Sequence, residues 1–339
     1  MSKVKLVGHE KILIIRPDRI GDLVLTLPVA AMLKKFYPKL TIHYLVSGYN
    51  ASVIKYARHI DDYMLISDSN GGRVGSAKLV ELLESQSYNL AIFSKPGWLT
   101  SFACFLAGIP LRLGTSRRSY SFFFNERIEM SRRHSNMHEV DLNLMMLRAF
   151  GINSEPGTIH PELARIPGKL STVPELNNIN EYVIIHPGSM GSAPNWSFER
   201  YADLIGLLSE KMQVVVTGQS NKSFELPDRA INLINKTDFD QLIEMISGAK
   251  LFISGSTGPM HIAAAFGTPV LGLFPNHPVM GPQRWAPRGK CVSYITPAKQ
   301  NGHICRIKDN GSCDCMEGIS MGDVYDKAFK MMTAGKRRS

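Results

Sequence analysis

The sequence lacks any apolar run as long as the roughly 18 to 20 residues that a membrane-spanning helix needs. Residues 1–22 hold an apolar stretch of only about five residues and no small-residue cleavage site, so we expect no secretory signal. Cysteine is scarce and odd in number, five in 339 residues, which argues against a secreted disulfide framework. Charged residues make up 20% and hydrophobic residues 44%, a composition that excludes collagen, coiled coil and disorder. These features predict a globular protein of the cytoplasm.

Negative charge is in deficit, because 39 Lys and Arg against 29 Asp and Glu give a net charge of +10. Residues 1–165 hold 21 basic and 14 acidic residues, and residues 95–135 hold seven basic and two acidic ones. This concentration suits a nucleic acid, an anionic membrane surface or a phosphorylated substrate, and a solvated surface without a partner is the alternative. No RRM, KH, helix-turn-helix or zinc-finger signature accompanies the charge, so we expect no nucleic acid partner.

Short aliphatic runs alternate with helix-like segments in the first half of the chain. The expected strands are 11–17, 40–47 and 90–94, and the expected helices are 21–38 and 76–87. Pro28 lies inside 21–38 and predicts a kink or a break there. Strands that alternate with helices indicate a doubly wound parallel sheet.

A Pro/Gly-rich segment, 151–180, separates this half from a second α/β set. The expected strands there are 182–188, 213–218, 251–256 and 269–274, and the expected helices are 198–211, 238–248 and 259–266. We therefore predict an α/β protein with two Rossmann-like, doubly wound parallel-sheet domains that face each other across a cleft. The expected parts are an N-terminal domain (1–165), a linker (166–180), a C-terminal domain (181–325), and a helix end with a basic tail (326–339).

Ligands of open α/β sheets bind beyond the carboxyl ends of the strands, so the strand-to-helix junctions are the candidate sites. The first junction holds Arg16, Asp18, Arg19 and Asp22 directly after a buried strand. One of its carboxylates suits a general base that takes a proton from an acceptor hydroxyl. The structural alternatives are a helix N-cap for Asp22 and an ion pair of Asp18 with its neighbouring arginines.

The second junction, 186–196, is a Gly/Ser loop after the strand that begins at 182. Backbone N–H groups near Gly188 and Gly191 suit a phosphate, and an ordinary turn is the alternative.

The third junction, 254–261, places Ser256 or Thr257 as the N-cap of a helix with Pro259 in its first turn. The positive end of this helix favours an anion such as pyrophosphate. His261 faces either the ligand or the core.

Together the three junctions resemble glycosyltransferase family 9, the lipopolysaccharide heptosyltransferases. ILIIRPDRIGDLVLTLP (12–28) is similar to the amino-terminal signature of that family. VIIHPGS (183–189) with NWSFERYADL (195–204), and FISGSTGPMHIAAAFGTPVLGLF (252–274), are similar to its two carboxy-terminal signatures. The resemblance implies a GT-B architecture, in which the first domain mainly holds the acceptor and the second holds the nucleotide-sugar.

The resemblance also implies residue roles. Asp22 matches the catalytic base of an inverting transfer, with Asp18 as the alternative. The donor-binding residues implied are Gly188, Ser189, Ser192, Glu225 (at the ribose), Ser256, Thr257, Gly258 and His261. The acceptor-binding residues implied are Arg16, Arg19, Arg117 and Arg118.

The substrates implied are ADP-heptose and a hydroxyl of the lipopolysaccharide inner core, an acidic, lipid A-linked saccharide. The protein would act at the cytoplasmic face of the inner membrane of a Gram-negative bacterium, with peripheral membrane contact and no metal or other cofactor. Aromatic residues at 120–124 interleave with the basic stretch 112–133, and a strand or core segment is the alternative for them.

Two positions depart from the family pattern, since Pro194 replaces a lysine and Ser256 replaces an aspartate. Arg16, Arg19 or Lys222 are candidates for the missing positive charge. The departures leave open a transferase that uses another nucleotide-sugar and a non-catalytic nucleotide-binding protein.

The cysteines near the end of the chain are Cys291, Cys305, Cys313 and Cys315. They lack the paired C-x2-C spacing of zinc sites, so we expect reduced thiols that pack a loop, with a thiolate metal site as the alternative.

Overall fold

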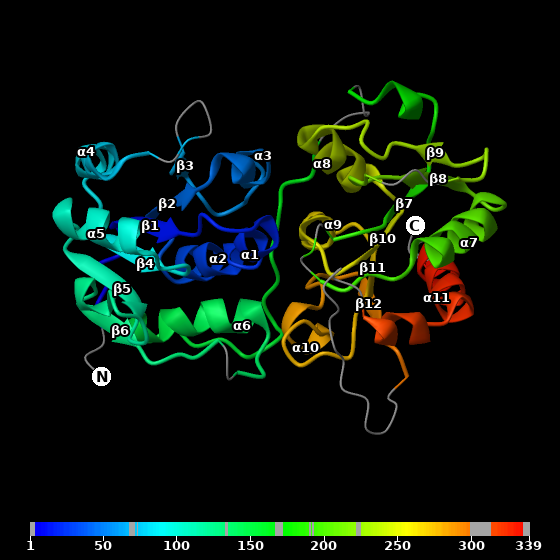
Figure 1. Cartoon of the computed structure of the whole chain (residues 1–339). Helices are drawn as coiled ribbons and strands as arrows, with labels where there is room; N and C mark the ends of the chain where they lie inside the picture. The colour runs from blue at the N-terminus through cyan, green and yellow to red at the C-terminus, as the bar shows by residue number, and fades with distance from the viewer. Residues whose placement is uncertain are drawn as a thin grey trace. The chain divides into compact units, whose positions relative to one another are not determined.

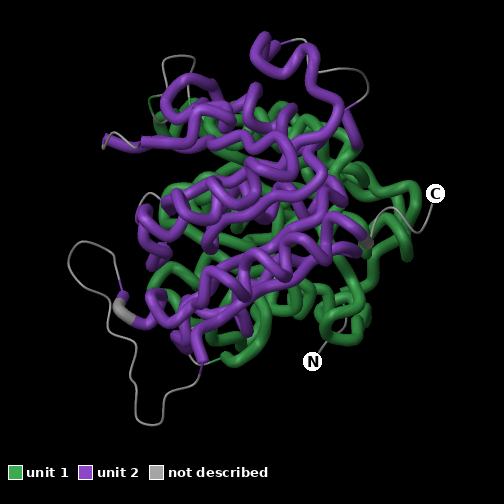
Figure 2. The backbone as a smooth tube through the Cα atoms, turned by 90° about the vertical axis from the view of Figure 1, so that its right-hand side faces the viewer, with its two compact units in different colours: residues 1–164 green, residues 165–339 purple. Residues whose placement is uncertain are grey.

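The structure, a computed structural model, describes residues 4–67, 72, 74–132, 135–166, 172–189, 191, 193–221, 225–298 and 313–334. The chain divides into two compact units, residues 1–164 and 165–339 (Figure 2). Each unit contains one six-stranded sheet in which all paired strands are parallel (Figure 1). Within the described residues, no helix combines the length and the apolarity that crossing a bilayer requires.

Unit 1 has the strand order β3-β2-β1-β4-β5-β6. Its strands are β1 (Lys11–Ile15), β2 (Thr41–Val46), β3 (Asp62–Leu65), β4 (Leu90–Phe93), β5 (Leu111–Thr115) and β6 (Glu126–Ile128). Its helices are α1 (Ile20–Val24), α2 (Leu27–Phe36), α3 (Ala51–Ile54), α4 (Ser76–Gln86), α5 (Trp98–Leu106) and α6 (Glu139–Leu144). Short 3-10 turns are η1 (Gly48–Asn50), η2 (Ser121–Phe123) and η3 (Met145–Phe150).

Unit 2 has the strand order β12-β11-β10-β7-β8-β9. Its strands are β7 (Tyr182–His186), β8 (Gln213–Val216), β9 (Ile231–Asn232), β10 (Leu251–Gly255), β11 (Val270–Leu273) and β12 (Val292–Ile295). Its helices are α7 (Phe198–Ser209), α8 (Phe239–Gly248), α9 (Gly258–Phe266), α10 (Pro282–Trp285) and α11 (Met321–Ala334), with 3-10 turns η4 (Pro174–Leu176) and η5 (Asp314–Gly318).

The central strands are buried on both faces, which explains their unbroken aliphatic sequences. In unit 1, Leu13 and Ile15 of β1 pack with Leu83 of α4 and Cys104 of α5 on one face. Tyr44 of β2 points to the other face, where its hydroxyl donates to the carbonyl of Thr26 between α1 and α2. Helices therefore cover both faces, as the doubly wound prediction requires.

Unit 2 repeats this arrangement. Val183 and Ile185 of β7 pack with Tyr201 of α7 and Val324 of α11 on one face. The hydroxyl of Tyr182 donates to the carbonyl of Met245 in α8 on the other face.

The expected helix over 21–38 is two helices. α1 ends at Val24 and α2 begins at Leu27, so Pro28 lies in the first turn of α2, where its missing N–H costs no helical hydrogen bond. The break predicted from Pro28 is confirmed. The N-cap alternative for Asp22 is wrong, because Arg19 occupies the N-cap position and Asp22 lies inside the first turn of α1.

Candidate active site

The three chemistry-bearing junctions follow the central strands of the two sheets. Both units have the strand order of a dinucleotide-binding fold, in which the chain changes direction between two central strands. These strands are β1 and β4 in unit 1, and β7 and β10 in unit 2. Ligands bind at the carboxyl ends of such strands. The first junction follows β1, the second follows β7 and the third follows β10.

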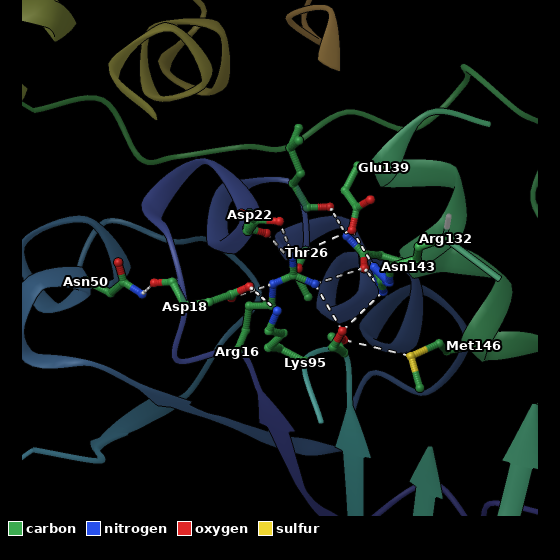
Figure 3. Close-up of polar contacts among 12 residues, drawn as sticks. Arg16, Asp18, Asp22, Thr26, Asn50, Lys95, Arg132, Glu139, Asn143 and Met146 are labelled. Carbon is green, nitrogen blue, oxygen red and sulfur yellow. Dashed lines mark hydrogen bonds and ion pairs between the residues drawn. The ribbon is translucent and has the colours of Figure 1, made fainter. Parts of the chain in front are cut away.

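A buried guanidinium organises the junction of unit 1 (Figure 3). Arg16 follows β1 and is 2% exposed. Its Nε lies 2.8 Å from Oδ1 of Asp18, its Nη2 pairs with Asp22, and the same Nη2 lies 3.6 Å from Oε1 of Glu139. Burial lowers the pKa of Arg16, but the three carboxylates outweigh burial and the net shift is upward. Arg16 therefore stays charged and holds the carboxylates in place.

Asp22 has the properties of a tuned base. Burial raises its pKa, the charge of Arg16 opposes that effect, and Asp18 and Glu139 add to the increase, so the net shift is upward. A carboxylate with a raised pKa accepts a proton more readily than an ordinary one. Asp22 lies in the first turn of α1, and the hydroxyl of Thr26 donates to its backbone carbonyl at 2.8 Å. These contacts fix the backbone of Asp22.

The contacts of Asp18 are typical of a residue that stabilises the fold. Besides its pair with Arg16, its Oδ2 lies 3.8 Å from Nζ of Lys95, and its backbone carbonyl accepts from Nδ2 of Asn50 at 2.9 Å. The predicted ion pair of Asp18 thus forms with Arg16, while Arg19 is exposed to solvent.

Three residues of this cluster were missed by the reading of the sequence. Glu139, at the start of α6, is 1% exposed and pairs with both Arg16 and Arg132. Arg132 also donates to Oδ1 of Asn143 at 2.8 Å, and Asn143 donates to the carbonyl of Leu25 at 2.9 Å. A signal existed in the sequence, since two acidic residues and an asparagine stand in the otherwise apolar EVDLNLMML.

The loop after β7 depends on glycine. Gly188 has a φ of 89° and Gly191 a φ of 78°, a left-handed region that L side chains rarely adopt. Ser189 is buried and its hydroxyl donates to the carbonyl of Ala193 at 2.6 Å, so it closes the loop on itself. Ser192 lies outside the described residues, as does Lys222.

A tryptophan fixes the far end of this loop. Trp196 is 1% exposed, and its Nε1 donates to the carbonyl of Ile319 at 3.3 Å. Arg200 donates to the same carbonyl at 2.9 Å. The loop is thereby attached to the segment that leads into α11.

At the third junction, Thr257 is the N-cap of α9 and its hydroxyl accepts from the N–H of Met260 at 3.3 Å. Ser254 lies behind it, with its hydroxyl 3.3 Å from that of Thr257. Ser256 is partly exposed and Gly258 begins the helix. The predicted N-cap is confirmed, and the nine-residue helix directs its positive end to this edge of the sheet.

Two histidines of unit 2 belong to the interior. His261 is 4% exposed, which agrees with the core alternative. His186 ends β7, with Nδ1 2.9 Å from the Thr217 hydroxyl, and burial lowers its pKa to about 4. At neutral pH, His186 is therefore uncharged and adds no positive charge to the junction.

A cavity of about 270 Å³ lies in unit 2 next to the loop after β7. Its wall is mainly apolar, with Glu199 and Glu225 among the lining residues: Pro187, Phe198, Glu199, Tyr201, Ala202, Ile205, Val216, Glu225, Leu226 and Ile234. A carboxylate that follows the second strand of a Rossmann-like unit commonly holds ribose hydroxyls. Glu225 has this position relative to β8.

The cysteines are divided between core and surface. Cys313 and Cys315 are buried in the unit 2 core, with their sulfurs 3.0 Å apart, and Cys291 is exposed. Cys305 lies outside the described residues. Within the part of the chain that is described, no group of three or more His, Cys, Asp or Glu side chains is arranged to hold a metal ion.

The two doubly wound units are the pair of Rossmann-like domains that make up the GT-B architecture. The sequence profile of glycosyltransferase family 9 (heptosyltransferase) matches residues 76–310. The chain belongs to this family, and it is a glycosyltransferase.

Relatives and solved structures agree with this assignment. A putative glycosyltransferase of Haemophilus influenzae is 31% identical over 319 residues, covering 87% of this chain and 92% of the relative. Lipopolysaccharide heptosyltransferase 3 of Escherichia coli is 27% identical over 275 residues, covering 75% and 79%. The structure of Escherichia coli ADP-heptose lipopolysaccharide heptosyltransferase II superimposes with a TM-score of 0.77 at 20% identity, covering 96% of this chain and 99% of that one. The predicted family and fold class are confirmed.

Proposed function

We propose that the protein transfers a heptose from ADP-heptose to a hydroxyl of the lipopolysaccharide inner core, with inversion at the anomeric carbon. The observation that carries the proposal is Asp22, a carboxylate of raised pKa that Arg16 holds at the carboxyl end of β1. The heptosyltransferases among the relatives support the choice of sugar and acceptor.

In the proposed reaction, Asp22 takes the proton of the acceptor hydroxyl while the hydroxyl oxygen attacks the anomeric carbon of the donor. The new glycosidic bond forms while the bond to the diphosphate breaks, and ADP leaves with the electron pair. Asp22 is the proposed base, and Asp18, which Arg16 and Lys95 neutralise, is the less suitable alternative.

On the donor side, we assign the diphosphate to the N–H groups around Gly188 and to the α9 terminus at Ser256, Thr257 and Gly258. Ser189 supports the loop through Ala193, and Glu225 is assigned to the ribose. His261 is 4% exposed within α9, so we assign it a supporting role in the interior rather than contact with the donor. No metal or other cofactor is part of the proposal, because helix and loop N–H groups stabilise the leaving diphosphate.

On the acceptor side, we assign the phosphorylated saccharide to the exposed side chain of Arg19, and the lipid-linked end of the acceptor to Arg117 and Arg118, which are also exposed. Arg16 is too deeply buried for this role and acts by positioning the carboxylates. Because the acceptor is lipid-linked, we place the protein in the cytoplasm with peripheral contact at the inner membrane of a Gram-negative bacterium.

The test is a titration of the purified protein with ADP-heptose, ADP-glucose, UDP-sugars and GDP-sugars, followed by turnover on inner-core acceptors. Preference for ADP-heptose and transfer that depends on Asp22 are the expected results. Preference for another nucleotide-sugar would favour the alternative motivated by Pro194 and Ser256, a transferase of the same fold with a different donor. Binding without turnover on any acceptor would favour a non-catalytic member.

A further inference from the structure

Exposed apolar side chains concentrate at one place on unit 1. Four of the twelve large hydrophobic side chains exposed in the described part of the chain lie between 98 and 122. Trp98 is 56% exposed, Phe105 47%, Leu106 49% and Phe122 60%. Scattered exposed hydrophobic residues are ordinary on a soluble protein, whereas a contiguous group marks an interaction site.

Ring contacts connect the three aromatic side chains of this group. Phe123 is buried, and its ring lies 5.3 Å from that of Trp98, 5.5 Å from Phe105 and 4.2 Å from Phe122, measured between centroids. The rings of Trp98 and Phe122 are themselves 6.1 Å apart. One buried phenylalanine thus joins side chains from α5 and η2 into a single surface.

Helix α5, WLTSFACFL, contains no charged residue. Its Ala103 and Cys104 face the core, while Trp98, Phe105 and Leu106 lie on the outer side over a length of roughly 12 Å. A helix that is apolar all round is normally buried in protein or lipid. In α5 the side chains of Trp98, Phe105 and Leu106 stay exposed on the surface of unit 1.

The surroundings of this face are positive. Between residues 95 and 125 the chain has four basic residues and no acidic one. Arg117 and Arg118 are exposed between β5 and η2, and Ser119, Tyr120 and Ser121 separate them from Phe122 in the sequence. Arg112 lies over the ring of Phe105, 5.4 Å from its centroid. Arg117 pairs with Glu129 at 3.4 Å, and because both side chains are exposed the pair is weak.

Backbone contacts hold this surface in one shape. The hydroxyl of Tyr120 donates to the carbonyl of Pro96 at 3.0 Å, and Nε of Arg112 donates to the carbonyl of Phe123 at 2.7 Å. The hydroxyl of Ser121 donates to the carbonyl of Thr115 at 2.7 Å. Because these bonds already fix the backbone that carries the rings, little backbone entropy is lost when the rings are covered.

We propose that Trp98, Phe105, Leu106 and Phe122, with Arg117 and Arg118, form a membrane-docking patch that inserts its rings into an anionic phospholipid surface. Trp and Phe favour the membrane interface, and Arg adds attraction to acidic headgroups. α5 follows β4 and α1, which contains Asp22, follows β1. Trp98 and Asp22 therefore both lie on the side of the sheet where the carboxyl ends of the strands are. The patch would hold the base near the saccharide of a lipid-anchored acceptor, and in this respect the inference rests on the proposed function.

Vesicle binding tests the patch without donor or acceptor. The full-length protein should sediment with vesicles of phosphatidylethanolamine and phosphatidylglycerol, and much less with phosphatidylcholine alone. The double variant Trp98→Ser/Phe122→Ser should bind at least about tenfold more weakly. The matched control is Phe36→Ser, an exposed phenylalanine at the end of α2.

The contribution of the two arginines and the insertion of Trp98 are measured separately. Arg117→Gln/Arg118→Gln should lose about fivefold in binding per charge at low salt, and the control pair Lys35→Gln/Lys39→Gln should lose far less. Insertion of Trp98 should shift the tryptophan emission to the blue when vesicles are added. Trp98→Phe should keep most of the binding and lose that shift, since Trp196 is buried and the third tryptophan, Trp285, lies in unit 2, outside the patch.

Three results would overturn the inference: no binding of the wild type to anionic vesicles, equal loss in Phe36→Ser, or unchanged binding of Trp98→Ser/Phe122→Ser. The last result would direct the search to a protein partner. Vesicle binding that is intact in a protein unable to transfer heptose would overturn the proposed function alone. Transfer to an acyl-free acceptor without vesicle binding would overturn the patch alone.

Discussion

The two sheets share one strand order, yet the ends of their central strands have opposite chemistry. The unit 1 junction is built from buried charge, with Arg16 paired to three carboxylates. The unit 2 junctions are built from glycine, hydroxyl groups and a helix N-terminus, and His186 there is uncharged. We therefore expect the same scaffold to serve proton transfer in one unit and binding of a diphosphate in the other. Changes in one unit should affect turnover, and changes in the other should affect donor affinity.

The largest expected effect is that of Asp22→Asn. Removing a general base lowers kcat by about 10²–10⁴-fold, while ADP binds to unit 2 as before. Turnover assays together with calorimetric titration of ADP measure the two quantities. Asp18→Asn is the matched control and should lose much less activity. If the two variants exchanged these phenotypes, Asp18 would be the base.

A weaker effect, on donor affinity rather than on turnover, is expected for Gly188→Ala. Its φ of 89° costs an alanine about 1–2 kcal/mol, so the affinity for ADP should fall about 5- to 30-fold. The kcat at saturating donor should stay near that of the wild type. The control is Gly75→Ala, because a Cβ at Gly75 meets nothing within 4 Å and its φ is ordinary. An unchanged ADP affinity in Gly188→Ala would place the diphosphate elsewhere.

A smaller loss is expected for Thr257→Val, which removes the hydroxyl that caps α9. Loss of an N-cap costs about 0.5–2 kcal/mol, so both the thermal midpoint and the ADP affinity should decrease. Thr257→Ser keeps the acceptor oxygen and should restore most of both. Thermal unfolding with and without ADP provides the measurement. Equal losses in the Val and Ser variants would mean that packing, rather than capping, is the role of Thr257.

The smallest expected effect is a shift in pH dependence for Glu139→Gln. The charge of Glu139 raises the pKa of Asp22, so its removal should lower that pKa. Because the base works when ionised, the acid limb of kcat/KM should move to lower pH, by about one unit or less. The other charged groups at Asp22 are Arg16, Asp18 and Arg132, and they remain in this variant.

A pH profile of kcat/KM, recorded well below the thermal midpoint, measures this shift and separates it from lost stability. A purely structural role for Glu139 would lower the midpoint and leave the acid limb where it is. A shift to higher pH would contradict the predicted sign.

The sequence predicted the parts of the fold that are set by local pattern. Buried strands such as β1 and β10 are unbroken aliphatic runs, and their junctions carry Gly, Ser and Asp in an order that a family signature matches. Edge strands were missed because they are short and half exposed: β3, for example, has no buried residue. Such strands lack the apolar alternation that reveals a strand.

The charge network was only half predicted, for a different reason. Arg16 and Asp22 are six residues apart, but Glu139 and Arg132 join them across more than a hundred residues of chain. No local periodicity reports such a contact, because the sheet and α6 must form before the groups meet. The assignment of catalytic and binding roles to these residues stays a prediction until the variants are measured.

The attachment of Trp196 and Arg200 to the carbonyl of Ile319 has a genetic consequence. Val324 and Ala328 of α11 fill the same core as the strands of unit 2. A nonsense mutation ahead of Ile319 would remove both that carbonyl and α11, which would uncover the core and release the far end of the glycine loop. Alleles truncated ahead of Ile319 should therefore behave as null alleles, although every residue assigned to chemistry would still be translated.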